Sequence, residues 1–233
     1  MPSLADLRRR LAADLLDIGA VTLAPEAPFE WSSGLRAPVY CDNRKTLAHP
    51  QVRRRIADGF AKALKQQAPE APTLVAGTAT AGIPHAALLA ARLSLPLSYV
   101  RSAAKGHGTG RRIEGGAPAG QRVVVIEDLV STGQSALEAA RALSRAGAEV
   151  TGVLAIFSYR LRAAEDAFAE APWLLHSLTD LPALLEVAEE EGPLDEDQLH
   201  TLRRWQRDPE GWSAGARENG RAGQREQTTL EAA

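Results

Sequence analysis

Two adjacent acids follow a dense apolar run and precede a loop of small polar residues. The run Val123–Ile126 leads directly into Glu127 and Asp128. Residues that could open a helix around a bound anion come next: Leu129, Val130, Ser131, Thr132, Gly133, Gln134 and Ser135. Hydroxyls and the unpaired N–H groups of a helix N-terminus bind phosphate. Carboxylates would repel that phosphate unless they accept hydrogen bonds from neutral donors, such as the vicinal hydroxyls of a sugar. The segment therefore indicates a site for a phosphorylated sugar, although Asp128 capping a turn beside a solvent-exposed Glu127 remains open.

A second loop of small residues lies between an apolar strand pattern and a helix pattern, at residues 77–84. It reads Gly-Thr-Ala-Thr-Ala-Gly-Ile-Pro, and Thr80 and Ala81 are its centre. Small residues expose successive backbone amides to an anion. The loop lacks the lysine of a P-loop, so it either binds an anion through its backbone or is a tight connection.

Cationic side chains alternate with glycine between residues 101 and 112. Arg101, Lys105 and His107 stand in the run Arg-Ser-Ala-Ala-Lys-Gly-His-Gly-Thr-Gly-Arg-Arg. A dinucleotide fingerprint is disfavoured because no apolar helix follows the glycines. The pattern suits a mobile cationic lid, and a solvated flexible loop is the alternative.

A Pro- and Gly-bounded segment at residues 31–42 carries Arg36, Tyr40 and Cys41. Cys41 is the only cysteine, so an intrachain disulfide and a Cys-based zinc site within this chain are both excluded. No base is suggested beside Cys41, which we interpret as a buried small residue rather than a nucleophile.

The elements that must position these groups alternate between strand and helix. Expected helices cover 4–18, 51–67, 84–93 and 135–145, and expected strands cover 73–76, 97–100, 122–126 and 149–157. Buried apolar strands alternating with helices predict an α/β fold with a mostly parallel sheet covered on both faces. Ligands of such sheets bind at the carboxyl ends of the strands, where the loops described above lie.

Composition limits the remaining possibilities. The 233 residues are 45% hydrophobic, and 27 Lys and Arg against 29 Asp and Glu leave a formal net charge of -2. This balance argues against a broad nucleic-acid surface.

Residues 71–91 contain no Asp, Glu, Lys or Arg, but their prolines and glycines favour strand, loop and buried helix over a membrane span. The start of the chain lacks a signal-peptide pattern, so we expect a cytoplasmic protein without a membrane partner. Residues 213–233 read as a disordered tail.

The four segments, in this order, resemble those of the type I phosphoribosyltransferases. The run Val-Val-Val-Ile-Glu-Asp-Leu-Val-Ser-Thr-Gly resembles the motif that binds phosphoribosyl pyrophosphate (PRPP). Lys-Gly-His-Gly resembles the catalytic loop of the orotate phosphoribosyltransferases, and Ser-Ser-Gly-Leu-Arg-Ala-Pro resembles their hood over the pyrimidine. The resemblance implies one catalytic domain over residues 1–212, with a hood from about 1–50 and parts of the C-terminal region. It also implies transfer of ribosyl phosphate from PRPP to N1 of orotate in pyrimidine synthesis.

Residue roles follow from the same resemblance. It implies catalysis by Lys105, Arg101, His107, Asp128 and Glu127, and pyrophosphate binding by the loop with Thr80 and Ala81. Its orotate contacts would come from Ser131, Arg36, Tyr40 and Tyr159, with Arg160 a further candidate for the carboxylate. Mg²⁺ would arrive on PRPP without a direct protein ligand, and a homodimer would share lid residues between its sites. A purine-type phosphoribosyltransferase, a non-catalytic PRPP-sensing regulator and a nucleotide-binding oxidoreductase are the alternatives.

Overall fold

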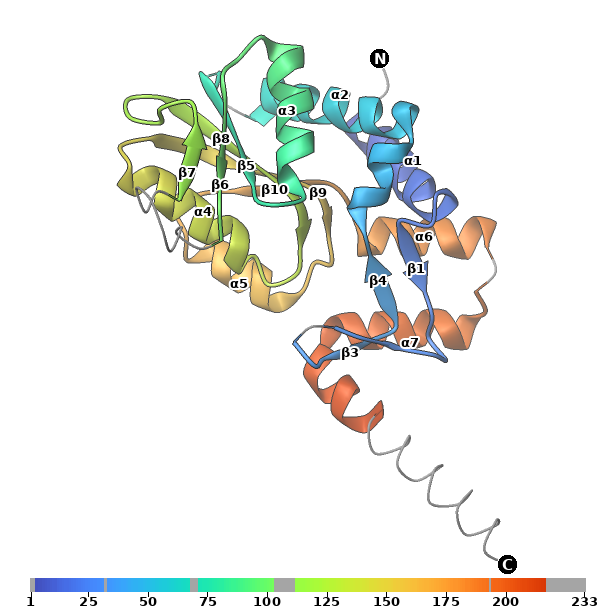
Figure 1. Ribbon diagram of the computed structural model, residues 1–233. Coiled ribbons are helices and arrows are strands. Elements are labelled where there is room, and N and C mark those ends of the chain that lie inside the picture. Colours follow the sequence, from blue (N-terminus) through green and yellow to red (C-terminus); the bar gives the residue numbers. More distant parts are fainter. Residues whose placement is uncertain (1–2, 32, 68–70, 103–111, 193, 217–233) are drawn as a thin grey trace, which may run out of the picture.

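A computed structural model describes residues 3–31, 33–67, 71–102, 112–192 and 194–216 (Figure 1). Its centre is a six-stranded sheet in the order β10-β9-β8-β5-β6-β7, parallel except for the edge strand β7. The strands are β5 (Leu74–Thr78), β6 (Leu97–Val100), β7 (Ile113–Gly115), β8 (Arg122–Val130), β9 (Glu149–Ser158) and β10 (Leu175–Asp180). The predicted α/β fold class is confirmed.

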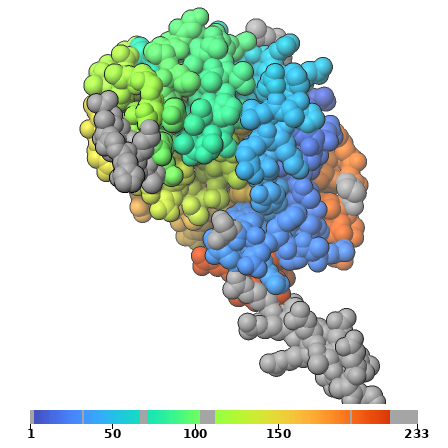
Figure 2. All heavy atoms as spheres, viewed as in Figure 1, coloured from blue at the N-terminus to red at the C-terminus, as the bar shows by residue number. Residues whose placement is uncertain are grey.

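Helices cover both faces of the sheet because the central strands are apolar on both sides. On one face Val124 and Ile126 pack beneath α1 (Leu4–Asp17), α2 (Pro50–Gln67) and α3 (Gly82–Leu93). On the other face Val123 and Val125 pack beneath α4 (Gln134–Arg145) and α5 (Arg162–Ala169). Figure 2 shows α3 and α2 side by side on the surface. Alternate side chains of β8 therefore pack into two separate hydrophobic cores, as expected for a buried parallel strand.

A smaller unit lies beside the sheet and is called the hood here. It pairs β1 (Val21–Leu23) with β4 (Val39–Cys41) and β2 (Phe29–Glu30) with β3 (Arg36–Ala37), both antiparallel. Helices α6 (Leu181–Glu191) and α7 (Glu196–Arg207) complete it, and a 3-10 helix, η1 (Asn43–Ala48), leads from β4 to α2. Its core gathers Trp205, Leu184, Val39 and Tyr159. The hood therefore combines chain from before and after the sheet (Figure 1).

Three expectations need correction. Strand β8 runs to Val130 instead of Ile126, because β9 continues to pair with it as far as Ser158. Strands β7 and β10 were not expected, since the sequence predicts helical structure after Tyr159. The predicted tail does not begin at Ser213, since residues 209–216 are helical and Ser213 is buried.

Residues 217–233 lie outside the described part of the chain. No helix among the described residues is long and apolar enough to cross a membrane.

Candidate functional site

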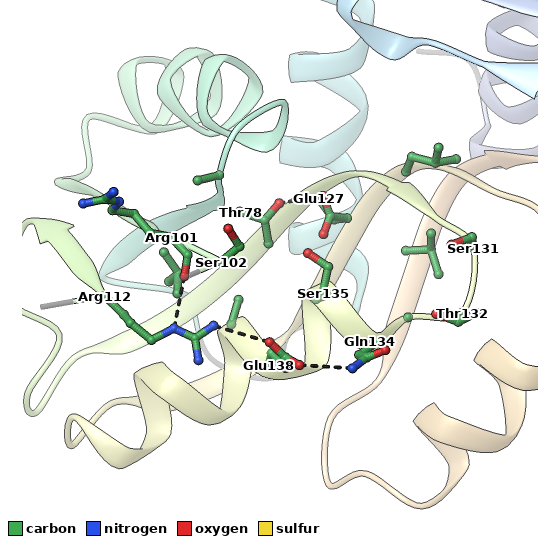
Figure 3. Close-up of a pocket in the computed structure, with 17 residues that line it drawn as sticks. Thr78, Arg101, Ser102, Arg112, Glu127, Ser131, Thr132, Gln134, Ser135 and Glu138 are labelled. Atoms are coloured by element: carbon green, nitrogen blue, oxygen red, sulfur yellow. Dashed lines mark hydrogen bonds and ion pairs between the residues drawn. The ribbon is translucent and has the colours of Figure 1, made fainter. Parts of the chain in front are cut away.

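A cavity of about 350 Å³ opens where β8, β5 and β6 end and α4 begins (Figure 3). Its lining residues come from both predicted loops and from the two described ends of the predicted lid: Thr78, Ala79, Val100, Arg101, Ser102, Arg112, Glu127, Leu129, Val130, Ser131, Thr132, Gly133, Gln134, Ser135, Ala136, Glu138 and Ala139. The position agrees with the rule that parallel sheets bind ligands at the carboxyl ends of their strands.

Glu127 is the buried acid of this cavity, with only 5% of its surface exposed. Its Oε1 accepts hydrogen bonds from the Thr78 hydroxyl at 2.6 Å and from the Asp128 main-chain N–H at 3.0 Å. Its Oε2 is buried and has no partner among the described residues. Burial raises the pKa of the Glu127 carboxyl, and the Thr78 hydrogen bond opposes that shift. A buried acceptor without a partner is costly and is suited to a donor that arrives with a ligand.

Asp128 follows Glu127 directly but is absent from the cavity lining. After burial, its charge is a second cause of the raised pKa of the Cys41 thiol. Burial also raises the pKa of Asp128 itself, while hydrogen bonds from Glu127 and from the local backbone lower it. A hydrogen bond between the two carboxyl groups contributes to both pKa shifts, so the acids interact directly although only Glu127 lines the cavity. The alternative of a solvent-exposed Glu127 is wrong.

The loop between β8 and α4 forms one wall of the cavity. Gly133 precedes the helix with φ +79, a conformation that favours glycine, and a Cβ there would lie 2.7 Å from Cε2 of Phe168. Gly133 has no side chain to cap α4, so the first N–H groups of the helix face the cavity beside Ser131, Thr132 and Ser135. The hydroxyls and helix dipole suit a phosphate group, as predicted.

The second loop lies across the cavity from α4. Thr78 and Ala79 line the cavity, whereas Thr80 is exposed and neither it nor Ala81 belongs to the lining. The peptide bond between Ala79 and Thr80 is cis. Gly82 begins α3 so close to β8 that a Cβ would lie 2.6 Å from the Ile126 carbonyl oxygen. The loop is thus packed tightly between two strands.

Two arginines mark the described ends of the predicted lid. The Arg101 N–H donates to the Arg112 carbonyl at 2.8 Å, and Nε of Arg112 donates to the Arg101 carbonyl at 3.1 Å. Arg112 also reaches Glu138 at 3.4 Å, and Glu138 accepts a hydrogen bond from Gln134 (Figure 3). Lys105 and His107 lie outside the described residues. Among the described residues of the predicted lid, Arg101 and Arg112 both line the cavity.

The predicted orotate contacts divide in the same way. Ser131 lines the cavity, but Arg36, Tyr40 and Tyr159 do not. The Tyr159 ring is 2% exposed and packs against Trp31 and Trp205, with ring centroids 5.0 and 5.7 Å away. Burial raises the pKa of its hydroxyl. In this structure Tyr159 is a core residue of the hood.

Arg36 and Tyr40 are also held within the hood. The Arg36 N–H donates to Oγ of Ser213 at 2.9 Å, and its guanidinium donates to the Ala216 carbonyl at 3.3 Å. Tyr40 is 41% exposed, and its ring packs at a tilt of 40° against Phe29. Arg160, the further candidate, pairs with Glu165. None of these described side chains is placed at the cavity.

Cys41 is buried, and burial raises the pKa of its thiol, so the prediction of a buried small residue is confirmed. The sequence places Thr78 in the candidate anion loop at residues 77–84 without giving its hydroxyl a role, and it misses Glu138 altogether. Thr78 is the last residue of β5, and only the pairing of β5 with β8 brings it to Glu127. Glu138 lies four residues after Gln134 on α4, a helical spacing that could have paired them.

Comparison with known proteins agrees with this architecture. The family model described as "Phosphoribosyl transferase domain" matches residues 43–169, which include β5, β8 and both cavity loops. The chain is therefore a member of the phosphoribosyltransferases.

Curated relatives narrow the class. The chain is 55% identical over 208 residues to an orotate phosphoribosyltransferase of Bacillus caldolyticus, covering 89% of this chain and 100% of the relative. It is 54% identical over 204 residues to that of Bacillus subtilis (strain 168), covering 88% of this chain and 94% of the relative. Within its class, the chain belongs to the orotate phosphoribosyltransferases.

Solved structures support the same assignment. The crystal structure of orotate phosphoribosyltransferase from Aeropyrum pernix matches with a TM-score of 0.68 and 36% identity, covering 78% of this chain and 99% of that one. The Mycobacterium tuberculosis H37Rv enzyme in complex with PRPP matches with a TM-score of 0.60 and 26% identity, covering 76% and 98%.

Proposed function

We propose that this site transfers the ribosyl phosphate of PRPP to N1 of orotate, giving orotidine 5′-monophosphate and diphosphate in pyrimidine (UMP) synthesis. The observation that carries the proposal is the buried, unpartnered Oε2 of Glu127 in the same cavity as the hydroxyl loop and the uncapped N-terminus of α4. A phosphorylated sugar offers both a hydroxyl donor and an anion, and the cavity has a place for each.

The reaction separates charge. The bond from the ribose C1 to pyrophosphate loosens as N1 of orotate attacks, so the sugar becomes positive and the leaving group becomes more negative. Glu127 accepts a hydrogen bond from a ribose hydroxyl and, when ionised, stabilises the cationic sugar. Asp128, which interacts with Glu127, supports the same ribose.

The remaining contacts hold the two phosphate ends of PRPP. Ser131, Thr132 and Ser135 donate to the 5′-phosphate together with the N–H groups that begin α4. Arg101, Lys105 and His107 neutralise the departing pyrophosphate, and the backbone of the loop with Thr80 and Ala81 supports it. Ser131, Arg36, Tyr40 and Tyr159 are the candidates for orotate.

Mg²⁺ is the expected companion of PRPP. The carboxylate oxygens of Glu127 and Asp128 are donors that Mg²⁺ accepts, but the described residues hold no group of three or more acidic, His or Cys side chains that could bind a metal ion. We therefore propose that the ion is carried by PRPP through substrate oxygens and water. When bound, it neutralises charge on the leaving pyrophosphate.

We also propose a cytoplasmic homodimer in which lid residues of one subunit serve the site of its partner. Lys105→Ala is expected to lower kcat by orders of magnitude without unfolding the protein. Mixing this variant with Asp128→Asn tests the shared site, because a mixed dimer contains one site free of both changes. Recovery of activity on mixing supports a shared site, and no recovery contradicts it.

A further inference from the structure

The backbone of Asp128 is held by side chains in place of a neighbouring strand. The pairing of β8 with β5 ends at Ile126, opposite Gly77. The Ile126 carbonyl faces β5, where the Thr78 hydroxyl lies 3.2 Å from it. Alternate residues of a strand direct their main-chain groups to the same side, so Asp128 faces the space beyond the end of that pairing.

Two side chains fill this space. The Asp128 N–H donates to Oε1 of Glu127 at 3.0 Å, and the Asp128 carbonyl accepts from Nδ2 of Asn43 at 2.6 Å. Asn43 is 1% exposed, so water does not compete for this hydrogen bond. It begins η1, the 3-10 helix between the hood and α2.

Asn43 is itself held in place. Its carbonyl accepts a hydrogen bond from the Thr46 hydroxyl at 2.6 Å, and that hydroxyl lies 3.4 Å from Nε2 of His85 on α3. Thr46 and His85 are both buried. This chain of buried polar groups connects α3, η1 and the end of β8, so the Asn43 amide is presented to Asp128 from a packed support.

We propose that Asn43 is a positioning residue for Asp128: its amide holds the Asp128 carbonyl and thereby fixes the backbone from which the carboxylate extends. The inference rests on the proposed role of Asp128 in holding the ribose. Asn43 lies outside the PRPP motif, so the proposal adds a residue that supports PRPP binding from another part of the chain. The position of Asp128 would then depend on η1, the segment that joins the hood to α2.

The test compares two substitutions in η1. Asn43→Ala removes the hydrogen bond to Asp128 itself, whereas Thr46→Val removes one support of Asn43 and keeps the Asn43 amide that donates to Asp128. We expect Asn43→Ala to lower kcat/KM for PRPP by about tenfold or more, because a small displacement of a group that holds the substrate lowers the rate strongly. We expect Thr46→Val to lower it by less than about threefold at a comparable loss of thermal stability. Equal activity losses in the two variants would overturn the proposal.

A double-mutant cycle separates positioning from stability. In an Asp128→Asn background, Asn43→Ala is expected to change kcat/KM by less than about threefold, because the group on which it acts is already disabled. Additive losses would contradict action through Asp128. The isosteric Asn43→Asp, which keeps the shape but places an acceptor against the carbonyl, repeats the comparison if the alanine variant folds poorly.

The affinity for PRPP distinguishes failure of this inference from failure of the proposed function. Calorimetric titration of PRPP with Mg²⁺ into wild type and Asn43→Ala should show weaker binding to the variant, whichever base the enzyme uses. Unchanged PRPP affinity and turnover in Asn43→Ala would reject the role of Asn43 and leave the function standing. A wild type that ignores orotate yet binds PRPP more tightly than the variant would reject the function alone.

Discussion

The hydrogen bond between Thr78 and Glu127 allows the account of the buried acid to be tested in detail. Thr78→Val removes the hydroxyl that donates to Oε1 of Glu127 at 2.6 Å and keeps the volume of the side chain. A buried hydrogen bond to a charged group contributes about 1.5–3 kcal/mol, and about 1.4 kcal/mol corresponds to tenfold in rate. If the carboxylate must be ionised in the transition state, kcat/KM for PRPP should fall by about 10- to 100-fold near neutral pH.

The same substitution should change how the reaction rate depends on pH. The Thr78 hydroxyl lowers the pKa of Glu127 against the effect of burial, so its loss raises that pKa further and leaves less carboxylate at a given pH. The deficit of Thr78→Val should therefore be largest at low pH and shrink as the pH rises. Initial rates across a pH series measure it, with Thr78→Ser as the control that keeps the hydroxyl. Equal rates in the two variants, or a deficit independent of pH, would refute the reasoning.

Two further predictions concern stability and use matched controls. Gly133→Ala should lower the free energy of unfolding by about 2–4 kcal/mol in urea titrations, because a positive φ strains alanine and its Cβ meets Phe168. Gly120→Ala, also at positive φ but with nothing within 4 Å, should lose only about 1–2 kcal/mol, and equal losses would exclude the clash.

Burial lowers the pKa of His85 to about 4, so the folded state binds fewer protons than the unfolded state between pH 6.5 and 4. Stability from this group is present above pH 6.5, and about 3 kcal/mol of it should be lost as the pH falls to 4. His85→Gln should remove that loss and exposed His200→Gln should not, whereas a pH dependence that persists in His85→Gln would contradict the assignment.

The sheet and its order of elements were largely predictable because buried parallel strands have a strong local pattern. The run Val123–Ile126 is apolar at every position, and the structure uses its alternate residues in two cores. The end of β8 was not predictable in this way. Glu127 and Asp128 are strand residues through their pairing with β9, and no local preference of acidic residues would indicate it.

The candidate site shows the same division. The hydroxyl loop and Glu127 were identifiable from residue types, since phosphate and diol binding need those groups in sequence. The roles of Thr78 and Asn43 were not identifiable from the sequence. Thr78 lies 49 residues from Glu127 along the chain, and Asn43 lies 85 residues from Asp128. Strand β7 could not be predicted because Ile113–Gly115 is too short to show an alternating hydrophobic pattern. Only its pairing with β6 identifies it as a strand.

The most direct test of the central claim is the loss of orotate absorbance when the purified protein is given PRPP and Mg²⁺. The account predicts orotate consumption that needs PRPP and stops when a chelator removes the metal, with no turnover of uracil, adenine or hypoxanthine in parallel reactions. Turnover of one of those bases while orotate stays unchanged would contradict it.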